Sequence, residues 1–270
     1  MKATVITPIG PLMSEPSADC ERADEALAGM VVELGESRNG YVKATTEYGY
    51  TGYMPERCLM MDEVKSRAWA ERPLRQITRA ALDVMAEPRV QARILNTLPR
   101  GARLAELDRR QGWAAVELPD GRQGYVRASG LAPRPDTPWQ HRSVWELRSD
   151  LARNALAYMG VQYRWGGKTP WGIDCSGLCS MAYLLAGVII YRDADIRPDY
   201  PIHEIAMERI GQGDLIFFPG HVALYLGDGR YIHATAAEGS DGVVVNSLRP
   251  DDSDFREDLY TSVTMVGSLF

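Results

Sequence analysis

The chain has 270 residues, of which 45% are hydrophobic and 24% are charged, and its formal net charge is -6. This composition is typical of a globular protein and excludes a disordered or fibrous chain, while the length favours about two domains without excluding three unequal ones. The negative charge and the lack of any long Lys/Arg run argue against nucleic acid as a partner.

The N-terminal residues and the cysteines indicate the compartment. The first residues include Pro8 and no continuous apolar stretch, so they do not resemble a secretory signal. The longest apolar stretch, residues 181–190, is far shorter than a helix that spans a bilayer. Four cysteines are too few for a disulfide scaffold and favour a reducing compartment. We therefore expect a cytoplasmic protein without membrane contact; the alternative is a secreted or cell-wall-associated protein whose signal peptide is missing from this sequence.

The N-terminal half contains a repeat with a period of 72 residues. LMSEPSAD at position 12 aligns with VMAEPRVQ at position 84, and the glycines of the two copies coincide without a gap. Short alternating segments between these glycines predict strands, so each copy, 1–62 and 74–132, is expected to be a small β-barrel. Because a module of about 60 residues is marginally stable alone, we expect each to pack against a neighbour. The Gly-aromatic pattern resembles bacterial SH3-like domains.

Two linkers and a third domain follow from the change in composition. Residues 63–73 join the repeats, and the proline-rich segment 133–140 stiffens the exit from the second one. Helices are predicted at 144–159 and from Cys175 to about Ala186. The segments GDLIFF, HVALYLG, RYIHAT and VVVNSL then predict successive strands, so residues 140–270 indicate an α+β domain.

Cys175 is the candidate nucleophile. It follows a glycine-rich aromatic loop and opens the second predicted helix, where the helix dipole and free N–H groups stabilise a thiolate and lower the thiol pKa. The backbone N–H groups of Cys175 and Ser176 are candidate donors to an oxyanion. Of the four histidines, only His221 and His233 lie in neighbouring predicted strands.

The register of those two strands decides whether the histidines meet. A two-residue turn at Asp228-Gly229 places position 233 opposite 224 and the histidines on opposite faces. A three-residue turn with a bulge at Gly229 pairs position 233 with 223 and leaves the histidines about 7 to 8 Å apart on one face. We expect the second register, with His221 as the general base and His233 as the residue that orients it.

Two other patterns are weaker. Cys179 follows Cys175 by one helical turn, but without a second ligand pair its expected role is core packing rather than zinc binding. The segment Gly166-Gly167-Lys168-Thr169 lacks the first glycine of a P-loop, because that position is Gln162, so nucleotide binding is not expected.

The combined motifs resemble a known family. YRWGG at 163, DCSG at 174, GDLIFF at 213, GHVALYLG at 220 and IHA at 232 are similar to those of the NlpC-type papain-like cysteine peptidases, and two preceding SH3-like repeats resemble its cell-wall recycling subgroup. The resemblance implies a multidomain fold of two small SH3-like β-barrels followed by an α+β papain-like catalytic domain on which they pack. It implies a peptidase that cleaves the γ-D-glutamyl-L-diamino acid bond of peptidoglycan stem peptides without a metal or organic cofactor.

The same resemblance assigns roles to residues. It makes Cys175 the nucleophile, His221 the base and His233 its orienting partner. It places Tyr163 beside the oxyanion site and Trp165 in the substrate cleft.

Substrate recognition is also implied by the resemblance. Ser176 would contact the D-glutamate, and Glu15, Tyr50 and Asp174 would bind the free amine of an N-terminal L-Ala. An ammonium held by two carboxylates and a phenol is a site that an N-blocked peptide cannot satisfy. Glu87 occupies the position of Glu15 in the second repeat, which leaves open a merely structural role for the Glu-Pro pair.

One segment departs from the family pattern. The expected R-x-S motif reads Arg192-Asp193-Ala194 here, so the serine hydroxyl is absent and Asp193 or Arg192 is expected to take its polar role. The leading hypothesis is a recycling endopeptidase for free peptides. The alternatives are an extracellular hydrolase of intact peptidoglycan with the repeats as wall anchors, an inactive wall-binding adaptor, and an acyltransferase on the same thiol scaffold.

Overall fold

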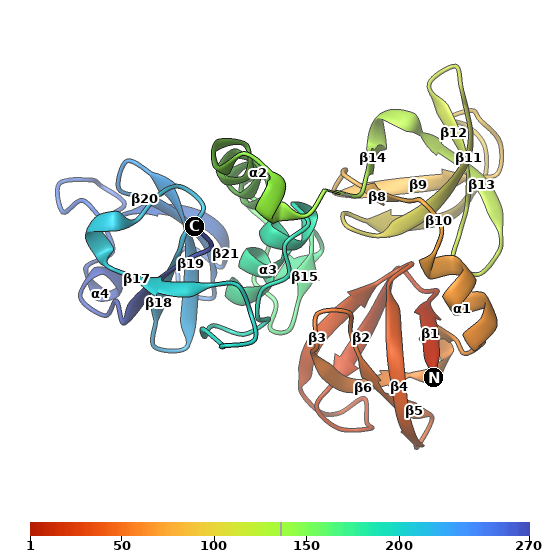
Figure 1. Ribbon diagram of the computed structural model, residues 1–270, viewed down its shortest axis with the longest axis horizontal. Coiled ribbons are helices and arrows are strands. Elements are labelled where there is room, and N and C mark those ends of the chain that lie inside the picture. The colour runs from red at the N-terminus through yellow and green to blue at the C-terminus, as the bar shows by residue number, and fades with distance from the viewer. Residues whose placement is uncertain (136) are drawn as a thin grey trace. The chain divides into compact units, whose positions relative to one another are not determined.

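The computed structural model describes residues 1–135 and 137–270, which form two compact units, Met1–Arg134 and Pro135–Phe270 (Figure 1). The first unit is almost entirely β-structure. Its elements are β1 (Lys2–Val5), β2 (Ile9–Met13), β3 (Arg22–Leu27), β4 (Val31–Arg38), β5 (Tyr41–Thr45), β6 (Thr51–Pro55), β7 (Leu59–Met60), α1 (Glu63–Ala70), β8 (Leu74–Ile77), β9 (Ala81–Met85), β10 (Ile94–Pro99), β11 (Arg103–Arg110), β12 (Trp113–Glu117), β13 (Gln123–Arg127) and β14 (Leu131–Pro133).

The first unit contains the same small barrel twice. One seven-stranded sheet has the order β3-β2-β6-β5-β4-β1-β7, and the other has the order β10-β9-β13-β12-β11-β8-β14. Each strand of the second sheet begins 72 residues after its counterpart in the first, as Lys2 and Leu74 show for β1 and β8. The predicted repeat and its alternating strands are therefore confirmed, and so is the expectation of two small β-barrels.

The predicted linker 63–73 contains a packed helix. Asp62 caps α1 by accepting a hydrogen bond from the backbone N–H of Lys65 at 3.0 Å. Trp69, 4% exposed, donates its indole N–H to the carbonyl of Gly29 at 3.0 Å. The segment thus ties its helix to the first barrel, because a buried tryptophan supplies the apolar contact that a short polar helix otherwise lacks.

The two barrels also bond directly to each other. The backbone N–H of Arg103 donates to the carbonyl of Ala28 at 2.8 Å, and its guanidinium donates to Glu47 through Nη1 at 2.7 Å. Gly29 has a φ of +80°, and a Cβ there would lie 2.6 Å from the Arg103 carbonyl oxygen, so only glycine permits this approach. Each small barrel therefore gains a neighbour, as expected from its size.

The second unit combines helices with one large sheet. Its elements are α2 (Val144–Leu156), β15 (Lys168–Thr169), β16 (Gly172–Ile173), α3 (Cys175–Leu185), β17 (His203–Ile205), β18 (Leu215–Phe218), β19 (His221–Gly227), β20 (Arg230–Thr235), β21 (Gly242–Ser247), α4 (Glu257–Tyr260) and β22 (Met265–Ser268). Part of the predicted linker 133–140, position 136, lies outside the described residues, while Trp139–His141 form a short 3-10 turn.

The sheet of the second unit is antiparallel and six-stranded, in the order β17-β22-β18-β19-β20-β21. Helices α2 and α3 lie beside each other, and α3 packs on β19 and β20 (Figure 1). Both predicted helices and all four predicted strands are present, which confirms the α+β class. Strands β17 and β22 were not predicted, and β17 is short and largely polar. In the part of the chain that the structure describes, no helix is long and apolar enough to span a membrane.

Candidate active site

Cys175 is the first residue of α3 and lies at the buried interface between that helix and the sheet. Asp174 caps the helix by accepting a hydrogen bond from the backbone N–H of Gly177 at 2.6 Å. A Cβ at Gly177 would lie 2.2 Å from the carbonyl oxygen of Gly167, so the DCSG segment needs glycine for this packing. These contacts fix the backbone that carries the thiol, which is only 7% exposed.

Arg192 forms a buried ion pair with Asp174. The guanidinium, 1% exposed, donates to the two carboxylate oxygens at 3.1 and 3.0 Å and to Ser176 Oγ at 2.7 Å. Asp174 also accepts from the backbone N–H of Gly166 at 2.8 Å. Arg192 is one of the two residues expected to replace the missing serine. Its guanidinium is used in hydrogen bonds to the residues on either side of Cys175. The predicted contact of Asp174 with a substrate amine stays a prediction.

The electrostatics of the thiol differ from the expectation. Burial, followed by the nearby Asp174 charge, raises the pKa of Cys175 to about 11, although backbone N–H groups of Val222 and Ser176 hydrogen-bond the sulfur and act in the opposite direction. The prediction of a lowered thiol pKa considered only the helix N-terminus and omitted desolvation, which is the larger effect here. The resting side chain is therefore a neutral thiol.

His221 and His233 meet as predicted. Strand β20 pairs with β19 so that Ile232 faces Leu224, the register that places position 233 opposite 223. His221 Nε2 lies 2.8 Å from His233 Nδ1, with the rings edge to face.

The turn that gives this register is different from the predicted one. Asp228 and Gly229, with φ of 49° and 75°, form a two-residue turn between Gly227 and Arg230, and the irregularity lies within β19 between Tyr225 and Gly227. The extra residue that shifts the register is therefore a bulge in the strand rather than a third turn residue.

Asn246 extends the histidine pair and was not predicted. Its Oδ1 lies 2.8 Å from Nε2 of His233, and its Nδ2 donates to the carbonyl of Asp254 at 2.8 Å. The sequence shows only a single amide in the apolar segment VVVNSL. Its position next to His233 becomes evident once β21 is paired with β20.

Burial lowers the pKa of both histidines. Burial, and then the neighbouring His233, lowers the pKa of His221 to about 3. Burial also lowers the pKa of His233, while the hydrogen bond that His233 makes to the Asn246 oxygen acts in the opposite direction. Cys175 reaches the start of β19, because the backbone N–H of Val222, the residue after His221, hydrogen-bonds its sulfur. A neutral imidazole and a neutral thiol are suited to general-base catalysis, in which the proton moves as the substrate is attacked.

Tyr163 and Trp165 border the nucleophile loop. Tyr163 is paired with Ile173 through a β-bridge, and its pKa is raised to about 12 by burial first and then by Cys175 and Asp174. The phenol therefore stays protonated near the thiol, where it can donate a hydrogen bond. Trp165 on the same loop is 61% exposed.

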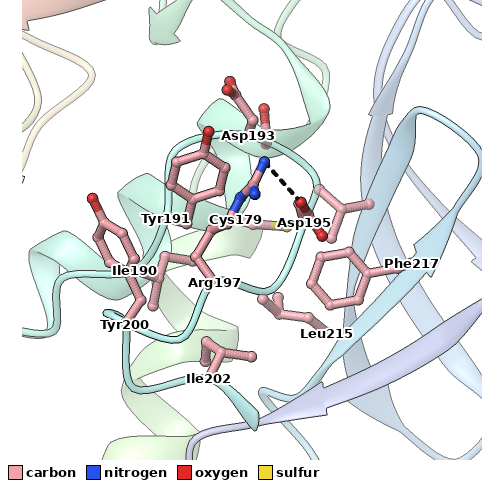
Figure 2. Close-up of a pocket in the computed structure, with 12 residues that line it drawn as sticks. Cys179, Ile190, Tyr191, Asp193, Asp195, Arg197, Tyr200, Ile202, Leu215 and Phe217 are labelled. Carbon is pink, nitrogen blue, oxygen red and sulfur yellow. Dashed lines mark ion pairs between the residues drawn. The ribbon is translucent and has the colours of Figure 1, made fainter. Parts of the chain in front are cut away.

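A small pocket adjoins Cys175 on the side of Ser176 and Val222, the two residues whose N–H groups reach the sulfur. Its enclosed volume is about 10 Å³. Figure 2 shows Tyr191 and Tyr200 on one side and Leu215 and Phe217 on the other, with the Asp195–Arg197 ion pair between the two sides. Asp193, the other residue expected to replace the missing serine, is exposed and lines this pocket. The pocket thus combines an apolar floor with a charged rim.

Glu15 and Tyr50 lie in the first unit. Glu15 is exposed in the segment between β2 and β3, and Tyr50 precedes β6 and is half-buried. Glu87, at the equivalent position of the second repeat, is paired with Arg89 at 2.9 Å. The amine site that these two residues are expected to form with Asp174 stays a prediction.

Metal ligands and disulfides are not part of this site. Within residues 1–135 and 137–270, no three His, Cys, Asp or Glu side chains are grouped to hold a metal ion. Cys179 is 1% exposed in the core and carries a free thiol, as do Cys20, Cys58 and Cys175.

A buried thiol at the start of a helix, beside two hydrogen-bonded histidines on an antiparallel sheet, defines a papain-like cysteine peptidase. Residues 160–256 match the NlpC/P60 family. The chain is 42% identical over 277 residues to dipeptidyl-peptidase 6 of Lysinibacillus sphaericus, covering 100% of both chains. The chain therefore belongs to the NlpC/P60 family.

Two further proteins resemble the chain over most of its length. It is 28% identical over 233 residues to a gamma-D-glutamyl-L-lysine dipeptidyl-peptidase of Bacillus cereus, covering 80% of this chain and 68% of the relative. The crystal structure of an NlpC/P60 family protein from Bacillus cereus has a TM-score of 0.81 at 21% identity over 98% of each chain, which shows the shared fold.

Proposed function

We propose that this cysteine peptidase hydrolyses the γ-D-glutamyl-L-diamino acid bond of peptidoglycan stem peptides. The observation that carries the proposal is the full-length similarity to dipeptidyl-peptidase 6, which extends over both repeats as well as the catalytic unit. The relative named for γ-D-glutamyl-L-lysine supports the same bond. Cys175, His221 and His233 supply the chemistry, and no step requires a metal or an organic cofactor.

The reaction follows from the neutral resting pair. His221 takes the proton of Cys175 as the sulfur attacks the γ-carbonyl carbon of the D-glutamyl residue, and the oxygen gains negative charge. Backbone N–H groups at the start of α3 and the protonated phenol of Tyr163 are the donors proposed for that charge. His221 then gives its proton to the leaving amine as the C–N bond breaks. Water next attacks the thioester carbonyl while His221 takes a proton from it, and that proton returns to the Cys175 sulfur as the C–S bond breaks.

The proposed substrate is a free peptide with an N-terminal L-Ala, as in cell-wall recycling, and the proposed location is the cytoplasm. Glu15, Tyr50 and Asp174 would bind the ammonium group, which requires the SH3-like barrels to pack on the catalytic unit. Because Arg192 already compensates the Asp174 charge, Glu15 would supply most of the attraction. Ser176 would contact the D-glutamate, and Trp165 would cover the cleft.

Product analysis by mass spectrometry tests the proposal. The chain is incubated with L-Ala-γ-D-Glu-meso-diaminopimelate, with its lysine analogue, with the N-acetylated forms and with purified sacculi. Release of L-Ala-D-Glu from the free-amine peptides alone supports recycling. Cleavage of sacculi without cleavage of the free peptides favours an extracellular hydrolase with the barrels as wall anchors. If none of these substrates is cleaved, the acyltransferase and adaptor hypotheses would be favoured instead.

A further inference from the structure

The side-chain amide of Asn246 has only one workable orientation. One end faces the carbonyl oxygen of Asp254 and the other faces Nε2 of His233, both at 2.8 Å. A backbone carbonyl can only accept a hydrogen bond, so the NH₂ group must face Asp254 and the amide oxygen must face His233. The opposite orientation would set two acceptors against each other.

The partner carbonyl is itself held in place. Arg230 binds the Asp254 carboxylate through two hydrogen bonds of 3.1 and 2.6 Å, and the backbone N–H of Ser247 donates to the Asp254 carbonyl at 3.3 Å. His233 has no exposed surface. Since bulk water does not reach the ring, its hydrogen bonds come from the protein.

This orientation fixes the protons of both histidines. The Asn246 oxygen only accepts, so Nε2 of His233 carries a hydrogen, and in a neutral imidazole Nδ1 is then an acceptor. That Nδ1 lies 2.8 Å from Nε2 of His221, which must therefore donate. The remaining nitrogen of His221, Nδ1, keeps its lone pair.

We propose that Asn246 is a positioning residue for the reaction: it sets the tautomers of His233 and His221 and leaves Nδ1 of His221 as the acceptor for the Cys175 proton. Asn246 acts through the two rings and need not contact substrate. The kinetic consequence rests on the proposed function, because it needs a substrate, whereas the tautomers themselves do not.

Nitrogen-15 NMR of the full chain labelled at histidine tests the tautomers directly near neutral pH. We expect Nε2–H forms for His221 and His233, and averaged signals for the exposed His141 and His203. Asn246→Ala should produce a mixture of tautomers at His233. Asn246→Asp keeps the acceptor that faces His233 and should retain the Nε2–H form, at a cost in stability because its second oxygen then faces the Asp254 carbonyl. Unchanged tautomers in Asn246→Ala would overturn the proposal, whether or not the peptide is hydrolysed.

Kinetics separate positioning from stability. Asn246→Ala should lower kcat about tenfold to a hundredfold with KM nearly unchanged, by analogy with the loss of an orienting partner at metal-bound histidines. Asn246→Asp should recover part of the lost kcat. The matched control is Asn154→Ala, which removes another amide that donates to a backbone carbonyl, that of Ala182 at 3.0 Å. An equal loss of kcat in Asn154→Ala would show a structural effect and overturn the proposal. If Asn246→Ala does not fold, the Asp variant decides: loss of its Nε2–H form at His233 would contradict the mechanism.

Discussion

His221 Nε2 lies 2.8 Å from His233 Nδ1, and this contact joins β19 to β20, the two strands on which α3 packs. The register of β19 and β20 produces the contact, and burial lowers the pKa of both rings. Burial also raises the pKa of Cys175 to about 11, so the proposed mechanism begins with the proton on sulfur.

Removal of the nucleophile or the base should abolish turnover. Cys175→Ala and His221→Ala should each lower kcat by about a thousandfold or more, since the thiol and imidazole act as one unit. His233→Ala should be milder because it acts through His221. Hydrolysis of the free tripeptide is the assay, and circular dichroism checks the fold.

The matched control is Cys58→Ala, which removes another buried free thiol in the first unit. It should retain full turnover. Wild-type activity in His233→Ala would contradict the assignment of the orienting residue.

Alkylation of Cys175 should reveal a neutral resting thiol. Iodoacetamide reacts with the thiolate, and burial raises the thiol pKa to about 11 while it lowers the pKa of His221 to about 3. Between these values both groups are neutral, so the alkylation rate should be low near pH 6 and rise about tenfold per pH unit through pH 9. Peptide mapping separates Cys175 from the more exposed Cys20. A rate that is already constant from pH 5 upward would instead show a preformed thiolate–imidazolium pair.

The Arg192–Asp174 pair should show strong thermodynamic coupling. Arg192→Met leaves the Asp174 carboxylate buried without its cation, and the loss of one partner of such a pair costs about 3–5 kcal/mol of unfolding free energy. Asp174→Asn removes the charge but keeps an oxygen that can cap α3. The double variant should therefore be more stable than Arg192→Met alone, as measured by urea unfolding of the three variants. Additive losses would show that the two side chains do not stabilise each other.

The sequence predicted the elements of this site better than their connections. Glycine spacing and apolar periodicity located α3 and β18 to β21, and the need for two histidines on one face selected the correct register. The predicted three-residue turn was wrong because the sequence HVALYLG gives no sign of the bulge within β19. Asn246 and the burial of Arg192 could not be predicted, since each depends on which residues the folded chain brings opposite them.

Selective recognition of a free amine should depend on Glu15 and Tyr50. Glu15→Ala and Tyr50→Phe should raise KM for the free-amine peptide and leave any slow cleavage of the N-acetylated peptide unchanged. Because an exposed carboxylate contributes modestly, an increase of about tenfold is expected for Glu15→Ala. The control Glu87→Ala alters the equivalent position of the second repeat, where the side chain is paired with Arg89, and should leave KM unchanged. Equal losses on both peptides would indicate a folding defect instead of lost recognition.

The stability of the paired barrels should depend on Trp69. Its indole is 4% exposed, packs with Leu74 and Ala105, and donates to the Gly29 carbonyl. Trp69→Ala removes this packing and leaves that carbonyl without its donor, so the first unit should lose about 3–5 kcal/mol of unfolding free energy. Trp145→Ala is the matched control, since that indole is 77% exposed on α2 and its removal should cost less than about 0.5 kcal/mol. Urea unfolding followed by circular dichroism measures both. If the two variants were equally stable, α1 would be a spacer between the barrels, and the direct bonds of Arg103 would have to hold them together.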